Sequence, residues 1–137
     1  MNRYEPLKAA IITSLGEIRA FICLFPDITW YYCENLKRFL NVEDQVEVDV
    51  LVVDLADRYH LSFEEHEMLK ALSRRYPIVA LLEPGDPAFW WMEAEGITVL
   101  RKPADIPYLA EYLFLQRDRI KAERLRRLFK KVAEAYR

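Results

Sequence analysis

The sequence predicts an α/β fold: a three-layer doubly wound (βα)5 sandwich with a five-stranded parallel sheet and an extended C-terminal helix. Short apolar runs alternate along the chain with segments of helical periodicity, which is the pattern of parallel strands joined by crossover helices. The apolar runs are nearly continuous, as expected for strands buried on both faces. The 137 residues suffice for one domain, and a hydrophobic content of 53% with only three glycines argues against disorder.

The central run is VDVLVVDL at 48–55, a β-branched apolar segment that contains a carboxylate near its end. A strand of this composition belongs in the middle of a parallel sheet. Asp54 then falls at the C-terminal end of the strand, which is the edge where open α/β sheets place their ligands and their chemistry. Asp54 is therefore the first candidate for a functional residue.

The other elements follow from similar runs and from the residues that bound them. Ser62 and Glu65 have the spacing of a capping box, which marks the start of a helix. Pro87 at the start and Gly96 after the end favour a helix between them. In chain order we expect a strand at 9–12, a helix at 15–25, a strand at 30–33, a helix at 34–41, the central strand, a helix at 62–76, a strand at 78–82, a helix at 87–95, a strand at 97–100 and a helix at 104–135.

Charge is distributed unevenly along the chain. Residues 117–137 hold nine basic and three acidic side chains, a balance of +6 that leaves −8 for the rest. Such asymmetry is typical of a separate functional element. We therefore expect a domain at 1–115 followed by a basic amphipathic extension at 116–137.

The sequence favours a cytoplasmic protein. No apolar run approaches the ~18 residues of a membrane span, and the first residues lack the apolar core of a secretory signal. Cys23 and Cys33 lie in apolar sequence, so we expect buried free thiols in a reducing compartment.

Four stretches, in order and at matching spacing, resemble the receiver domain of bacterial two-component response regulators, whose fold is the CheY-like, flavodoxin-like one. They are 10–19, 49–55, 77–86 and 96–103, and the resemblance spans roughly 7–115. It implies that Asp54 occupies the phosphoacceptor position. It also implies that Lys102, in the Lys-Pro signature, occupies the position that pairs with the phosphoryl group.

The chain departs from the receiver pattern at four further positions. Thr13 and Ser14 stand where receivers carry the acidic pair that holds Mg²⁺, and neutral hydroxyls lack the anionic oxygens that this ion prefers. Leu82 replaces a Thr or Ser that donates a hydrogen bond to the phosphoryl group, and Val99 replaces the aromatic residue that reorients on activation. We therefore expect a degenerate receiver that needs no cofactor, with Mg²⁺ bound only if phosphorylation persists.

Two functions remain open for this pattern. In the first, Asp54 and Lys102 form a structural ion pair, and the chain is a pseudo-receiver that regulates by dimerisation or by binding a partner. In the second, Asp54 is still phosphorylated by a histidine kinase or a small phosphodonor. An enzyme is not expected, because no glycine-rich phosphate loop and no nucleophile–histidine arrangement is present. His60 and His66 do not share a helix face and are expected to be exposed rather than metal-bound.

An aromatic segment at 89–92 predicts an interaction surface. Phe89, Trp90, Trp91 and Met92 surround a helix, so two of them fit a core and the others are expected to meet a partner. The resemblance agrees, because receivers usually dimerise through the fourth helix, the fifth strand and the fifth helix.

The last helix is expected to run beyond the domain. Its 32 residues span about 48 Å, whereas a domain of this size is about 30–35 Å across. Leu125, Leu128, Phe129 and Val132 form an apolar stripe in its distal part, which favours a helical pair in a homodimer. The alternatives are a helix folded back on its own domain, a link to an output domain or protein partner, and a basic surface for nucleic acid or acidic membrane.

Overall fold

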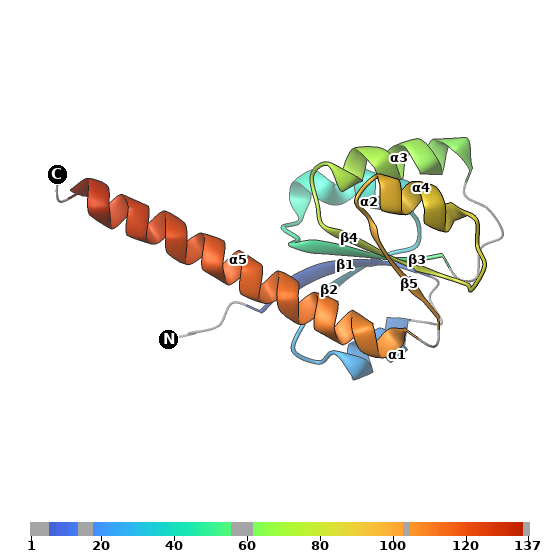
Figure 1. The fold of residues 1–137 in the computed structure, drawn as a ribbon, viewed down its shortest axis with the longest axis horizontal. Helices are drawn as coiled ribbons and strands as arrows, with labels where there is room; N and C mark the ends of the chain where they lie inside the picture. The colour runs from blue at the N-terminus through green and yellow to red at the C-terminus, as the bar shows by residue number, and fades with distance from the viewer. Residues whose placement is uncertain (1–5, 14–17, 56–61, 103–104, 136–137) are drawn as a thin grey trace.

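The computed structural model describes residues 6–13, 18–55, 62–102 and 105–135. Within them a five-stranded parallel sheet of order β2-β1-β3-β4-β5 lies between two layers of helices (Figure 1). The predicted three-layer doubly wound fold is confirmed. The elements are β1 Lys8–Ile12, α1 Ile18–Leu24, β2 Thr29–Cys33, α2 Leu36–Val42, the 3-10 helix η1 Glu43–Gln45, β3 Val50–Asp54, α3 Phe63–Ser73, β4 Ile78–Leu82, α4 Ala88–Ala94, β5 Thr98–Arg101 and α5 Ile106–Ala135.

The central strand divides the core into two. All five residues of β3 are buried, and they alternate between the two faces of the sheet. Leu51 and Val53 pack in the cluster formed with α2, α3 and α4, whereas Val50 and Val52 pack in the cluster formed with α1 and α5. A strand buried on both sides accepts apolar side chains at every position, which explains the continuous run in the sequence.

The order of the strands reverses direction between β1 and β3. From β1 the chain crosses to β2 on one side, and from β3 it proceeds through β4 to β5 on the other. Ligands of open α/β sheets bind outside the carboxyl ends of the strands at such a switch point. Thr13 follows β1 and Asp54 ends β3, so both residues lie at this point.

The boundaries of several elements differ slightly from the prediction. α3 has both bonds of the expected capping box: the Ser62 side chain accepts from the Glu65 amide at 3.1 Å, and the Glu65 carboxylate accepts from the Ser62 amide at 3.4 Å. Pro87 is the cap of α4 rather than its first residue, and Gly96 ends the turn after it with a φ of 79°. The predicted start of the first helix and His60 lie outside the described residues.

α5 is one continuous helix that overruns the sheet. Leu109 and Leu113 are buried against β-strands, and Ile120 packs at the edge of the same cluster. Burial against the sheet raises the pKa of Tyr112 to about 12. Beyond an ion pair between Arg124 and Asp49 at 3.9 Å, the helix projects past the domain (Figure 1). The predicted overrun is confirmed, and the alternative in which the helix folds back on its own domain is wrong. The boundary at residue 115 stays a prediction.

The two thiols differ in exposure. Cys23 is exposed on α1, so its predicted burial is wrong. Its helix has only seven residues, and Phe21 turns into the core whereas Ile22 and Leu24, on either side of Cys23, are exposed. Cys33 is half-buried in β2, and burial raises the pKa of its thiol, partly offset by Arg38.

Candidate functional site

Three polar side chains meet at the carboxyl edge of the sheet, each from the end of a different strand. The Thr13 hydroxyl, after β1, donates a hydrogen bond of 2.9 Å to Oδ2 of Asp54 at the end of β3. The Lys102 ammonium, after β5, donates to the same oxygen at 2.7 Å. Each carboxylate oxygen has two lone pairs, so Oδ2 accepts its full complement from these two donors.

The site is largely removed from solvent. The Asp54 side chain is 1% exposed and that of Lys102 is 19% exposed, while Thr13 is buried. The Lys102 nitrogen also lies 5.6 Å from the centre of the Phe21 ring, within the range of a cation–π attraction. A buried carboxylate is stable only when it is paired and hydrogen-bonded. Lys102 and Thr13 meet that requirement for Asp54.

The positions that would complete a phosphoryl site are apolar or neutral. Leu82 is buried in the core, and Val99 packs partly against the same cluster. The backbone joins the two sides of the site, since the Lys102 amide donates to the Leu82 carbonyl at 3.0 Å. Ser14 lies outside the described residues. Thr13 therefore contributes a donor at this edge, where a carboxylate would have contributed a metal ligand.

The residues that the structure describes at this edge do not fit a Mg²⁺ ion. No group of three or more His, Cys, Asp or Glu side chains that could hold a metal exists among the residues that the structure describes. At the edge itself, the hydroxyl of Thr13 acts as a donor to Asp54, so its hydrogen points at the carboxylate. A magnesium site needs several oxygen ligands that present lone pairs to the ion.

Solved structures share this fold. The receiver domain of the Francisella response regulator 1452 matches with a TM-score of 0.66 and 20% identity, over 85% of this chain and 99% of that chain. A Rhodopirellula baltica protein named adenylate cyclase matches with a TM-score of 0.67 and 17% identity, over 93% and 99%. RcsB, in a structure of two dimers bound to two parallel DNAs, matches with a TM-score of 0.62 and 18% identity, over 82% and 62%.

This chain has the fold of receiver domains. Neither a protein-family model nor a curated protein matches its sequence. On the receiver fold, the ends of β1, β3 and β5 bring together Thr13, Asp54 and Lys102, as the sequence resemblance implies.

Two contacts of the site were not anticipated from the sequence. Phe21, which lies under the Lys102 ammonium, is an ordinary apolar residue of α1 and carries no signal of this role in the sequence. Compared with the receiver pattern, the sequence shows only that Thr13 lacks the negative charge of an acidic residue. In the structure its hydroxyl also donates a hydrogen bond, which helps to hold Asp54.

The aromatic segment of α4 divides between core and surface. Met92 is fully buried, so it is unavailable to a partner and its place among the interface candidates is wrong. Phe89 and Trp91 pack partly against the core, whereas Trp90 is 75% exposed. Trp90 meets Phe89 edge to face, with ring centres 5.3 Å apart. α4 therefore offers one large exposed aromatic side chain, set beside a half-buried one.

His66 also differs from the prediction. It is half-buried on α3 and stacks on Trp91 with ring centres 3.8 Å apart. Its Nε2 atom is buried without a hydrogen-bond partner among the described residues. Its aromatic ring, rather than its polarity, determines its place in the fold.

The distal part of α5 is exposed at every candidate position. Leu125, Leu128, Phe129 and Val132 are between 45% and 67% exposed. No helix in the described part of the chain has the length and apolarity that crossing a membrane requires.

Removal of the Lys102 charge is expected to destabilise the fold strongly. In Lys102→Met the Asp54 carboxylate remains buried without its cation, and the free energy of unfolding should fall by about 3–5 kcal/mol. Urea denaturation followed by circular dichroism measures this change. In Asp54→Leu/Lys102→Met no charge is left buried, so the double variant should be more stable than Lys102→Met. A double variant that is less stable than Lys102→Met would contradict the structural role of the pair.

Proposed function

We propose that this chain is a pseudo-receiver: a cytoplasmic regulatory module of a bacterial two-component or transcriptional regulator that works by association and not by phosphoryl transfer. The observation that supports this most strongly is the engagement of Asp54 by Lys102 and Thr13. The polar edge of the receiver fold is retained, but it is used to hold the sheet together.

Electrostatics disfavours phosphoryl transfer at this edge. Phosphoryl transfer is catalysed by groups that stabilise charge on the transferred oxygens, chiefly a metal ion and fixed cations. Thr13 supplies no negative charge to bind a metal, and Leu82 supplies no hydrogen-bond donor. Lys102 would have to leave its 2.7 Å contact with Asp54 in order to serve an incoming phosphoryl group alone. Each of these differences disfavours phosphoryl transfer to Asp54.

Exposed apolar side chains support association. Trp90 on α4 is exposed, and the distal residues of α5 form a separate stripe of large apolar groups with an exposure that is unusual for such groups. Aromatic residues are enriched in protein interfaces. We propose a homodimer through α4 and α5, with an output domain or protein partner as a further ligand. The structure of RcsB as dimers bound to DNA supports association in a protein of this fold.

A second candidate function is that of a phosphoacceptor receiver. It is favoured by one observation, the presence of both Asp54 and Lys102 at the carboxyl edge. In that case the bonds of Thr13 and Lys102 to Asp54 would open to admit the phosphoryl group.

Beryllofluoride, a phosphoryl analogue, separates the two functions. Titration of the full chain with beryllofluoride and Mg²⁺, followed by tryptophan fluorescence and calorimetry, should give no saturable binding. Asp54→Asn should give the same baseline, and an unmodified receiver with its acidic pair is the positive control. Saturable binding that disappears in Asp54→Asn would establish the phosphoacceptor function instead.

The distal part of α5 should be required for the dimer. A chain that ends after Arg124 keeps Leu109, Leu113 and Ile120 in the core and the ion pair to Asp49. We expect the full chain to sediment as a dimer and the shortened chain to sediment as a folded monomer. An unchanged mass after shortening would remove the role of α5 in the association.

A further inference from the structure

The apolar stripe of distal α5 is turned away from the sheet. We call Leu125, Leu128, Phe129 and Val132 the distal stripe. Each residue advances an α-helix by about 100°, so the middle of the distal stripe lies roughly 130° around α5 from the face of Leu109 and Leu113. That face is buried against the sheet. The distal stripe is therefore not a continuation of the surface that docks α5 on its own domain.

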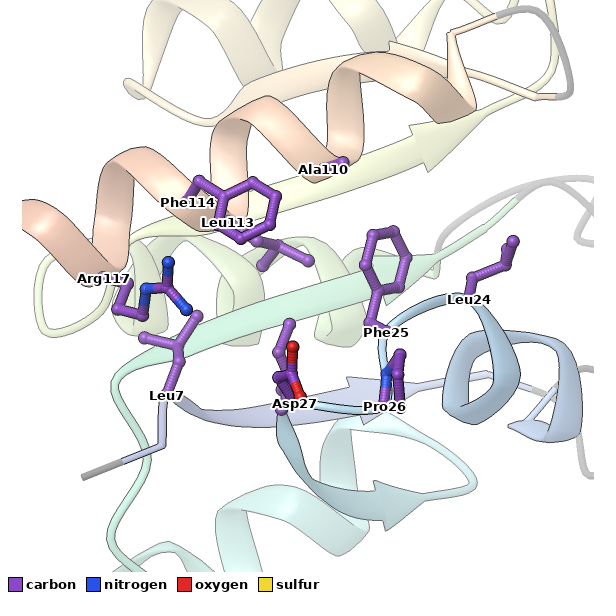
Figure 2. A pocket seen from close by; sticks show the side chains of 10 residues that line it. Leu7, Leu24, Phe25, Pro26, Asp27, Ala110, Leu113, Phe114 and Arg117 are labelled. Atoms are coloured by element: carbon purple, nitrogen blue, oxygen red, sulfur yellow. The ribbon is translucent and has the colours of Figure 1, made fainter. Parts of the chain in front are cut away.

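A groove runs between α5 and the end of α1 (Figure 2). It has a volume of about 130 Å³, and its walls are mainly apolar. Leu24 and Phe114 at its rim are each at least 50% exposed. We call it the α1–α5 groove. Its lining comprises Leu7, Leu24, Phe25, Pro26, Asp27, Ile28, Ala110, Leu113, Phe114 and Arg117.

The groove and the distal stripe are matched in spacing. The helical wall of the groove is Ala110, Leu113, Phe114 and Arg117, which is an i, i+3, i+4, i+7 set. The distal stripe has the same i, i+3, i+4, i+7 spacing. The two sets lie within about 60° of one another around the helix, so a second helix can contact both along one side of α5. This spacing is unchanged when it is read backwards, which suits an antiparallel helix pair.

We propose that the distal stripe of one copy of this chain docks in the α1–α5 groove of a second copy, and the reverse, in an antiparallel α5 pair. The proposal rests on the homodimer proposed above: it keeps the role of α5 in that dimer and moves α4 out of the dimer surface, to a different partner. Antiparallel pairing about a two-fold axis near residue 121 places Leu128 opposite Phe114 and Phe129 opposite Leu113. Such an arrangement closes on itself, as a two-fold dimer must, whereas a parallel one would leave a stripe and a groove open at the ends.

Charge complementarity supports a second copy as the occupant. The same pairing places Asp118 opposite Arg124 of the second copy and one helical turn from Lys121 of that copy, so two Asp118 carboxylates flank the two Lys121 side chains that meet at the axis. The groove is lined by the carboxylate of Asp27 as well as by Arg117, and the helix that enters it carries six basic side chains between 121 and 131. Opposite charges across an interface fix its register and favour the matching partner.

This surface is separate from α4. The groove lies on the α1 and α5 side of the sheet, whereas α4 packs on the other side with α2 and α3. The pairing therefore leaves Trp90 exposed in the dimer and available to an output domain or protein partner.

Point variants test the docking. Phe129→Glu in the stripe and Phe114→Glu in the groove replace exposed residues, so both variants should fold, as circular dichroism will verify. In sedimentation equilibrium the wild-type chain should be a dimer and each variant a monomer. Lys130→Glu places the same carboxylate on distal α5, about 150° from the stripe, and should remain dimeric. Trp90→Glu should also remain dimeric.

Mixing the two variants gives the sharpest outcome. A heterodimer of Phe129→Glu and Phe114→Glu contains one intact stripe–groove contact, so the mixture should have a higher average mass than either variant alone at the same total concentration. No increase, or a dimeric Phe114→Glu, would overturn the reciprocal docking. A wild-type dimer that is disrupted by Trp90→Glu and not by Phe114→Glu would overturn this surface but not the proposed association. A monomeric wild-type chain would overturn both.

Discussion

The ion pair between Asp54 and Lys102 is the constraint on which the carboxyl edge of this protein depends. Asp54 belongs to the fully buried β3, and Lys102 follows the edge strand β5, with β4 between them. The contact spans that width of sheet at 2.7 Å, and the Thr13 hydroxyl extends it to the end of β1. A carboxylate that is 1% exposed has no solvent to stabilise its charge, so its partners are fixed by the cost of separating them.

This constraint relates the fold to its proposed use. A receiver edge that binds a phosphoryl group must leave its carboxylate and its lysine able to separate. Here neither the hydroxyl of Thr13 nor the apolar side chain of Leu82 offers an interaction that would compensate for separating Asp54 from Lys102. Trp90 on α4 and the distal residues of α5 are exposed, away from this edge. In the proposed function these helical surfaces bind partners, and the polar edge stabilises the sheet that carries them.

Much of the fold follows from the sequence because the three central strands, β1, β3 and β4, are buried on both faces and are therefore continuous apolar runs. The capping residues Ser62 and Glu65 are equally local, and their bonds are present. The receiver resemblance placed Asp54 and Lys102 at one edge, since parallel strands present their carboxyl ends together. The burial and the contacts of individual side chains could not be predicted from the sequence in the same way. The choice of Met92 for the core and Trp90 for solvent depends on how α4 is rotated against the sheet. The stack of His66 on Trp91 and the position of Phe21 under Lys102 are contacts between different elements, which no local pattern specifies.

The central claim is that this chain associates without any chemistry at Asp54. Sedimentation of the folded Asp54→Leu/Lys102→Met variant, beside the wild-type chain at the same concentration, tests it most directly. The account predicts the same dimer mass for both proteins, unchanged by beryllofluoride and Mg²⁺. A variant that is folded but monomeric, or a wild-type dimer that forms only with beryllofluoride, would contradict it.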